Sequence, residues 1–185
     1  MAPLWISDQP DASLVREVVA GKTEAFNVLV TRWERRVYSY LVYLTGLPDD
    51  AFDMCQEVFL SAYKNLAQLR DARTFQKWLF QIAHNTACSH LRRPSGAGPE
   101  LIEGGLCSSS TSRVGNATAW ERGELRLVVE KALAQLPMEQ REAIVLKVYQ
   151  GFKFTEIAEI QNCPLSTVKT RVYSGFEQLK RLLQT

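Results

Sequence analysis

The chain has 185 residues, 46% of them hydrophobic and 23% charged, with a formal net charge of +2. This length suits one large domain or two small ones, and the nearly balanced charge excludes a general binder of polyanions, so any affinity for nucleic acid must come from local patches. Four scattered cysteines without a Cys-x2-Cys pair, and only two histidines, predict reduced thiols, a cytoplasmic location, no metal site and no cofactor. No signal peptide and no apolar run of membrane-spanning length is present, so we expect no direct membrane insertion.

The N-terminal half predicts a loose arm over residues 1–10 and then four helices. These helices are expected over residues 11–20, 23–45, 49–66 and 74–93. The third helix starts with acidic side chains, which suits the positive end of a helix dipole, and its apolar stripe is expected to include Phe52. The fourth helix and the loop before it are basic, because residues 70–93 contain five Lys or Arg against one Asp.

Residues 95–118 interrupt the helical pattern. They are rich in Gly and Ser and lack periodicity, which predicts a flexible linker. Helical spacing resumes near residue 119, and no strand-type alternation occurs anywhere. We therefore predict an all-α fold of two small helical domains, 11–94 and 119–185, joined by this linker.

The segment 153–172 is typical of a helix-turn-helix, which would form the end of the C-terminal domain. Ala158 is small enough for a second helix to pack closely, Asn162 tolerates the left-handed conformation of a sharp turn, and Pro164 can open the next helix. Five apolar residues then recur at helical spacing and predict the buried stripe of the second helix: Val168, Val172, Phe176, Leu179 and Leu183.

The opposite face of this second helix carries hydrogen-bond donors, two cations and an aromatic ring. These residues are Ser166, Thr167, Lys169, Thr170, Arg171 and Tyr173. The DNA major groove accepts one α-helix, and such side chains can contact base edges and phosphates there. A helical hairpin with a merely solvated polar face is the alternative interpretation, but the turn and the cations favour DNA.

Taken in order, these segments resemble the extracytoplasmic-function (ECF) sigma factors of bacterial RNA polymerase. Residues 53–64 (DMCQEVFLSAYK) resemble the helix by which that family binds the polymerase, and residues 75–93 resemble its helix for the minus-ten promoter element. Residues 136–143 (LPMEQREA) and the helix-turn-helix resemble its domain for the minus-thirty-five element. The resemblance implies a non-enzymatic protein that binds core RNA polymerase and promoter DNA, and that an anti-sigma protein restrains.

The resemblance also implies site residues. Polymerase binding is expected from Asp53, Gln56 and Glu57 in the third helix, although a solvated acidic helix start would look the same. Binding of the minus-ten element and its melted strand is expected from Arg73, Thr74, Phe75, Asn85, Cys88, Ser89 and Arg92. The six residues on the outer face of the last helix are expected to bind the minus-thirty-five element. The chain departs from the family at Lys153, where a Ser or Thr cap is usual, and at Gly175, where further arginines are common.

The length of the predicted linker implies that a larger partner holds the two domains apart on DNA. A flexible chain of about 25 residues has a root-mean-square span of ~25–30 Å, whereas two promoter elements one and a half duplex turns apart are separated by ~50–60 Å. We therefore expect the isolated protein to bind promoter DNA poorly and the polymerase to hold the domains apart. Two rivals remain open from the sequence: a helix-turn-helix regulator that never enters the polymerase, and a helical scaffold with no role on DNA.

Overall fold

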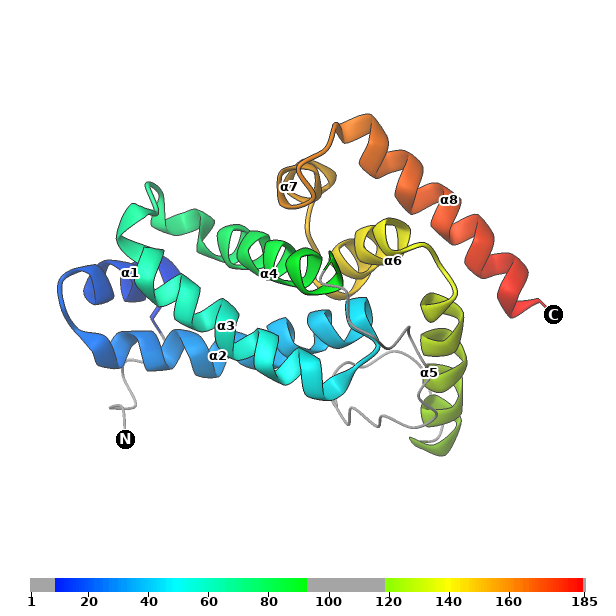
Figure 1. Cartoon of the computed structure of the whole chain (residues 1–185), viewed down its shortest axis with the longest axis horizontal. Coiled ribbons are helices and arrows are strands. Elements are labelled where there is room, and N and C mark those ends of the chain that lie inside the picture. The colour runs from blue at the N-terminus through cyan, green and yellow to red at the C-terminus, as the bar shows by residue number, and fades with distance from the viewer. Residues whose placement is uncertain (1–8, 93–118, 185) are drawn as a thin grey trace.

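The computed structural model describes residues 9–92 and 119–184, and their regular structure is entirely helical, which confirms the prediction of an all-α fold for this part of the chain. The predicted linker lies outside the described residues. Figure 1 shows the succession of helices, which are α1 (Asp11–Val19), α2 (Thr23–Thr45), α3 (Pro48–Asn65), α4 (Phe75–Arg92), α5 (Ala119–Ala134), α6 (Met138–Ile144), α7 (Phe154–Ile160) and α8 (Leu165–Leu183). Two short 3₁₀ turns, η2 (Leu66–Gln68) and η3 (Ala72–Thr74), precede α4, and a π-helical turn, η4 (Val145–Tyr149), follows α6.

The N-terminal helices pack around α2, which contacts α1, α3 and α4. Its inward stripe repeats every three or four residues and is buried over its whole length, from Phe26 through Trp33 and Tyr40 to Leu44. Trp33 Nε1 donates a hydrogen bond to the carboxylate of Asp11 at 3.0 Å, which ties α1 to α2. Gly46 then ends the helix with φ 72°, a left-handed conformation that costs a glycine little.

The C-terminal helices form the predicted helix-turn-helix. Asn162 has φ 47°, the one non-glycine residue with positive φ in the described part of the chain, so the expected left-handed turn is confirmed. Pro164 stands just before α8, as expected for a residue that opens a helix. Lys153 does not cap α7 through its side chain; instead its backbone N–H donates to Glu156 Oε2 at 2.7 Å, which satisfies one donor at the start of the helix.

Helix α8 packs against α6 at Gly175. A Cβ atom built at this position would lie 2.7 Å from Ile144 Cδ1 and 3.4 Å from Gln140 Cβ, so only a glycine permits this approach without a shift. Val168, Val172 and Leu179 of the predicted stripe are buried, but Phe176 is 43% exposed and Leu183 46% exposed, so that part of the prediction is wrong.

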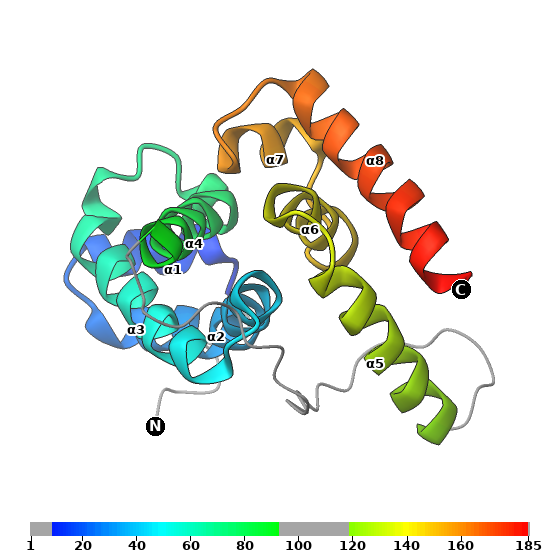
Figure 2. The same cartoon turned by 45° about the vertical axis from the view of Figure 1, so that its right-hand side comes forward.

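The two halves of the chain pack against each other, which the sequence did not predict. Figure 2 shows α6 and α7 beside the N-terminal helices, and α4 contacts α7 while α2 contacts α5, α6 and η4. The rings of Phe80 in α4 and Phe152, just after η4, meet edge to face with centroids 5.1 Å apart, and both side chains are buried. Their packing joins the halves into one continuous core. Helical spacing marks an apolar face but does not say which element covers it.

Gly175→Leu should lower the free energy of unfolding by roughly 1–3 kcal/mol, because a large side chain would overpack the contact with Ile144. Ser174→Leu, one residue earlier on an exposed position of the same helix, is the matched control and should change stability little. Urea unfolding followed by circular dichroism measures both. Equal changes in the free energy of unfolding for the two substitutions would show that stability does not depend on the close contact between Gly175 and Ile144.

Candidate polymerase and nucleic-acid interfaces

The outer face of α8 is open over the residues expected to contact DNA. Ser166, Lys169, Thr170 and Tyr173 are exposed, with Tyr173 at 63%, and Thr167 is half-buried. They lie within the first three turns of α8, so one surface presents three aliphatic hydroxyls, an ammonium group and a phenol ring. Such a surface can contact phosphates through Lys169 and base edges through the shorter side chains.

Arg171 differs from the rest of this set. Its guanidinium Nη1 donates to Gln161 Oε1 at 3.0 Å and lies 3.4 Å from Cys163 Sγ, so the side chain folds back onto the turn of the helix-turn-helix. Arg171 is therefore half-buried and engaged within the protein. A contact from Arg171 to a base would require this hydrogen bond to break.

Helix α4 presents a second polar strip. Asn85, Ser89 and Arg92 are exposed at spacings of four and three residues, which places them on one side of the helix. Thr74 and Arg73 lie at the start of the same helix in η3, and the 18 residues of α4 make it about 27 Å long. The structure thus brings five of the seven predicted minus-ten residues into one elongated strip.

The other two predicted minus-ten residues do not join this strip. The ring of Phe75 is fully buried in the core, so it cannot stack on a base, and we correct its assignment to a core residue. Cys88 is half-buried and turned towards His84, with Sγ 3.6 Å from Nε2 of that ring. Helical spacing could not distinguish these two residues from the residues of the strip, because each is the sequence neighbour of one of them, Phe75 of Thr74 and Cys88 of Ser89.

The loop before α4 is held by Asp71. Its carboxylate accepts a hydrogen bond from the backbone N–H of Arg73 at 3.0 Å and pairs with the guanidinium of the same residue, Nη2 lying 3.0 Å from Oδ2. These hydrogen bonds lower the pKa of Asp71. Thr74 Oγ1 donates to the Asp71 carbonyl oxygen at 2.8 Å. The exposed Arg73 is therefore presented from a preorganised turn.

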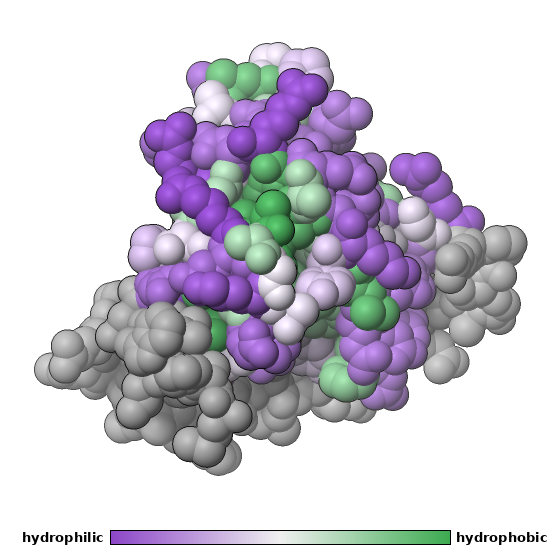
Figure 3. All heavy atoms as spheres, turned by 90° about the vertical axis from the view of Figure 1, so that its left-hand side faces the viewer, coloured by the Kyte–Doolittle hydropathy of each residue, from purple (hydrophilic) through white to green (hydrophobic). Residues whose placement is uncertain are grey.

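A hollow opens between α1 and this loop. Its lining combines apolar side chains, three arginines and one carboxylate: Val15, Arg16, Val19, Ala67, Leu69, Arg70, Asp71, Ala72 and Arg73. Figure 3 looks onto this end of the molecule and shows apolar surface near the centre of a mostly hydrophilic face. Apolar side chains next to arginines can contact a planar ring attached to a phosphate chain.

Helix α3 carries the three predicted polymerase-binding residues on its solvent side. Asp53, Gln56 and Glu57 are all exposed, and Glu57 Oε2 lies 3.1 Å from His90 Nε2 of α4. The acidic side chains stand over the first half of the helix, where the dipole favours negative charge.

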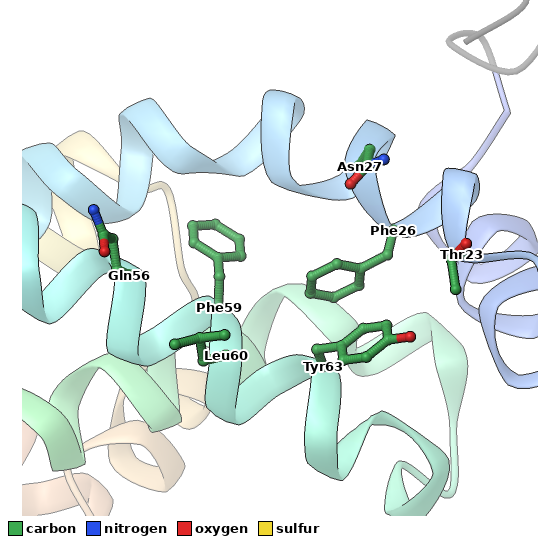
Figure 4. Close-up of a pocket in the computed structure, with 7 residues that line it drawn as sticks. All are labelled: Thr23, Phe26, Asn27, Gln56, Phe59, Leu60 and Tyr63. Atoms are coloured by element: carbon green, nitrogen blue, oxygen red, sulfur yellow. The ribbon is translucent and has the colours of Figure 1, made fainter. Parts of the chain in front are cut away.

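Exposed apolar residues extend this face of α3. Phe52, predicted to point inward, is instead 58% exposed, and Leu60 and Tyr63 are 59% and 46% exposed. Leu60 and Tyr63 also border a shallow pocket between α2 and α3, which Figure 4 shows, lined by Thr23, Phe26, Asn27, Gln56, Phe59, Leu60 and Tyr63. Sequence reasoning missed this stripe, although one signal was present: α3 has more apolar residues than one buried face can hold. Large exposed apolar side chains beside carboxylates are typical of a protein-binding surface.

Glu142 of α6 is the most deeply buried charged side chain in the described part of the chain, at 1% exposure. Tyr40 donates a hydrogen bond to its Oε1, His84 Nδ1 lies 2.7 Å from the same oxygen, and Gln161 Nε2 donates to Oε2 at 2.8 Å. The carboxyl group is thus satisfied from α2, α4 and the end of α7 at once, as a buried charge requires.

These contacts shift the titration of both partners. Burial disfavours the imidazolium of His84, but its hydrogen bonds to Cys88 and Glu142 and the charge of Glu142 raise its pKa to about 10. Burial, followed by the charge of Glu142 and their hydrogen bond, raises the pKa of Tyr40 well above its ordinary value. His84 therefore carries a proton at neutral pH and forms an ion pair with Glu142.

Two further searches of the described residues bear on function. No three His, Cys, Asp or Glu side chains there come together in a way that could hold a metal ion. None of the helices in residues 9–92 and 119–184 combines the length and the apolar character needed to cross a bilayer.

Comparison with known proteins matches each half of the chain to a protein family. The family model for Sigma-70 region 2 matches residues 29–96, and the model for Sigma-70, region 4 matches residues 126–179. The ECF RNA polymerase sigma-E factor of Escherichia coli K12 is 35% identical over 94% of each chain. The RNA polymerase sigma-H factor of Pseudomonas aeruginosa is 30% identical over 97% of this chain and 96% of its own.

The chain belongs to the ECF sigma factors. It is an RNA polymerase sigma factor, which binds the core enzyme and directs promoter recognition and melting. Solved structures agree on the fold: CnrH in complex with the cytosolic domain of CnrY has a TM-score of 0.70 at 24% identity and covers 94% of this chain and 97% of its own. The sigma factor RpoE from Bartonella quintana, in complex with the anti-sigma factor NepR, has a TM-score of 0.68 at 23% identity, over 86% of this chain and 97% of its own.

The stability of the sigma factor should fall as the pH rises above neutrality. The pKa of His84 in the folded protein, about 10, exceeds its value of ~6.5 in an unfolded chain, so its contribution is complete below pH 6.5 and is lost as the pH rises to about 10. The free energy of unfolding should therefore decrease between pH 6.5 and 8.5 by at most about 1.4 kcal/mol per pH unit. Urea unfolding at several pH values measures the slope, and His84→Gln should flatten it. An identical slope in the variant would contradict the pairing.

Lys169→Ala should weaken binding of the sigma factor holoenzyme to promoter DNA, because Lys169 is an exposed cation on the outer face of α8, which is expected to contact DNA. If its contact is to a phosphate, the loss should be nearly uniform across sequences, and the slope of log K against log salt should fall by about 1. Lys180→Ala, the same change in the last turn of α8, is the control and should leave both quantities unchanged. Fluorescence anisotropy of labelled duplexes at several salt concentrations tests this, and equal effects at the two positions would mean that the surface is misassigned.

Proposed function

We propose that separate helices of this sigma factor bind the polymerase and the two promoter elements. Residues 11–94 bind the polymerase through α3 and the minus-ten element through α4 and its preceding loop, and residues 119–185 bind the minus-thirty-five element through α8. The observation that carries this assignment is that exposed polar or cationic side chains gather on three separate helical faces, one on each of these helices.

On α8, the proposed contacts to the minus-thirty-five duplex come from Ser166, Thr167, Lys169, Thr170 and Tyr173. Arg171 would join them only after its hydrogen bond to Gln161 breaks. A helix reads the major groove from its first turns, and these residues lie in the N-terminal half of α8. The small polar side chains allow the backbone of the helix to come close to the bases.

On α4, the proposed contacts to the opened minus-ten strand come from Arg73, Thr74, Asn85, Ser89 and Arg92. Their arrangement along about 27 Å of one helix side suits an extended single strand rather than a compact ligand. The hollow beside Arg73, with its apolar walls and its arginines, is the proposed pocket for a base that leaves the stack. Capture of an unstacked base offsets part of the cost of melting, which is a few kcal/mol.

On α3, the proposed polymerase contacts combine the carboxylates of Asp53 and Glu57 with Gln56 and the exposed side chains of Phe52 and Leu60. A mixed surface of this kind supplies an apolar centre and a charged rim, which together give affinity and orientation. The carboxylates on this face repel phosphates, which supports a polymerase-binding side that is separate from the nucleic-acid side of the domain.

An anti-sigma protein is the proposed regulator. The structural relatives CnrH and RpoE were each solved in complex with a second protein, CnrY and the anti-sigma factor NepR respectively, and both cover most of this chain. We propose a corresponding partner here, a site of action in the cytoplasm, and a role without catalysis by the chain itself, since the chemistry of transcription belongs to the polymerase.

Run-off transcription with core RNA polymerase tests this function. The purified chain should give start-site-specific transcripts from a promoter template without any other initiation factor. Leu60→Glu should raise the dissociation constant for core polymerase about tenfold or more, because it places a charge in the apolar part of the α3 face.

Val19→Glu is the matched control for polymerase binding. Val19 is an equally exposed apolar residue, at 55%, but it lies on α1 beside the DNA-binding hollow. It should leave the affinity for core polymerase unchanged in the absence of DNA. Failure of the wild-type chain to bind core polymerase would refute the proposed function, whereas equal losses in both variants would refute only the placement of the interface on α3.

A further inference from the structure

Arg171 lies on a different side of α8 from the other cation in the set expected to contact DNA. An α-helix turns by about 100° per residue, so Arg171 stands roughly 200° around the helix from Lys169. Ser166, Lys169 and Tyr173 instead follow one another at spacings of three and four residues and share one side. Val168, one turn before Arg171, is fully buried. Arg171 therefore stands at the edge of the buried stripe and not in the middle of the outer face.

The side-chain amide of Gln161 holds the guanidinium of Arg171 in place. Gln161 follows α7 directly and is 7% exposed. Its Nε2 donates to the carbonyl oxygen of Glu139 at 3.2 Å and to Oε2 of Glu142 at 2.8 Å, and its Oε1 accepts from Nη1 of Arg171 at 3.0 Å. A flipped amide would set its NH₂ group against the guanidinium and its oxygen against two acceptors, so this orientation alone satisfies all three partners. One buried amide thus joins α8 to α6.

The guanidinium also covers the turn of the helix-turn-helix. Nη1 of Arg171 lies 3.4 Å from Sγ of Cys163, whose backbone N–H donates to the carbonyl oxygen of Ala158 at 3.0 Å. Asn162, between Gln161 and Cys163, has a φ of 47°, a conformation that is unfavourable for any residue with a Cβ atom. Arg171 therefore contacts the residues on both sides of the left-handed position and stabilises the turn there.

The position of the outer face of α8 depends on this turn. Helix α7 has seven residues, and helices shorter than about 12–15 residues are marginal in water by themselves, so its orientation relative to α8 depends on packing and side-chain contacts. Ser166, Lys169 and Thr170 follow the turn within the first two turns of α8. Side chains that contact a ligand must be held within about 0.5 Å of the productive geometry. A displaced turn would misplace all three of these residues together.

We propose that Arg171 is a positioning residue of the helix-turn-helix: its guanidinium, held by Gln161 and Cys163, fixes the turn and thereby the outer face of α8, the proposed recognition helix, for the minus-thirty-five element. The guanidinium keeps these partners when DNA is bound. The inference rests on the proposed function of α8 and changes the role of one residue within it. A lysine at this position would keep the charge but not the planar donor group that lies against Gln161 and Cys163.

Three possible roles of Arg171 predict different behaviour on DNA. Loss of a phosphate contact lowers the slope of log K against log salt by about 1, and a lysine restores most of the affinity. Loss of a base contact relaxes the preference at one base pair. Loss of a positioning residue lowers the affinity for all promoter sequences alike and leaves the salt slope unchanged, and a lysine does not restore the affinity.

Binding of the holoenzyme to labelled promoters separates these roles. We expect Arg171→Ala and Arg171→Lys each to raise the dissociation constant about tenfold, the equivalent of one hydrogen bond to a charged group. The salt slope and the base preference across a panel of minus-thirty-five substitutions should match those of the wild type. Lys169→Ala should lower the slope, and Lys180→Ala, at an exposed position of the same helix, should change nothing.

Each contrary result of this experiment would overturn the proposal: an unchanged dissociation constant in Arg171→Ala, restoration by lysine to within about twofold of the wild type, a lower salt slope, or a relaxed preference at one base pair. Circular dichroism of the variants verifies that they fold. Binding of the wild-type holoenzyme to the promoter is the separate test of the proposed function, so a failure of the function is distinguishable from a failure of this inference.

Gln161→Leu tests the same contact from its other side. Because Gln161 and Arg171 act together, Gln161→Leu should also raise the dissociation constant, and the double variant with Arg171→Ala should lose no more than about twofold beyond either single variant. If Arg171 instead bound DNA, its release by Gln161→Leu would maintain or increase the affinity. An affinity of Gln161→Leu equal to or above that of the wild type, or losses that multiply in the double variant, would overturn the proposal.

Nuclear magnetic resonance of the full-length wild-type chain gives a test without DNA or a folded variant. A guanidinium held by Gln161 rotates slowly about its Cζ–N bonds, so the Nη groups of Arg171 should give separate signals, whereas the exposed Arg92 should give averaged ones. The signals should persist when a duplex carrying the minus-thirty-five element is added. Averaged signals from Arg171 in the free chain, or loss of their separation on DNA, would overturn the proposal.

Discussion

The structure depends on how it satisfies one buried carboxylate. Glu142 retains only 1% of its exposure, and removal of such a group from water costs several kcal/mol unless hydrogen bonds replace the lost solvent. Its partners come from α2, α4 and the end of α7, so no single domain satisfies the group. The resulting position of α6 orients the helix-turn-helix relative to α4, and with it the two surfaces that we propose to meet DNA.

The recognition helix is placed by a second constraint, the absence of a side chain at Gly175. The backbone of α8 approaches Ile144 so closely that a Cβ atom would lie 2.7 Å from a methyl carbon. A glycine inside a helix costs about 1 kcal/mol relative to alanine, and the close packing of α8 on α6 offsets this cost. Gly175 lies on the side of α8 that packs against α6, whereas Lys169 and Tyr173 are exposed.

The interaction surfaces are individually modest, and this fits a protein that works on a scaffold. The α8 surface offers Lys169 as its exposed cation, and the α4 strip offers Arg73 and Arg92. Two weak DNA-binding surfaces joined in one complex gain affinity through effective concentration rather than through new contacts. An isolated sigma factor with little affinity for promoters is the physical result.

The sequence by itself determined the helices, the left-handed turn at Asn162, the helix-turn-helix and the family, because helical spacing, turn residues and ordered motifs are local properties of the chain. It also indicated most of the polar strip on α4. It wrongly placed Phe75 in that strip and Phe52 in the core: Phe75 is buried, and Phe52 is exposed on α3. Helical spacing alone does not fix which side of a helix another element covers. Only the tertiary structure decided that the two domains share a core and that Glu142, His84 and Tyr40 meet, since these residues are far apart in the chain and their contact depends on which surfaces pack together.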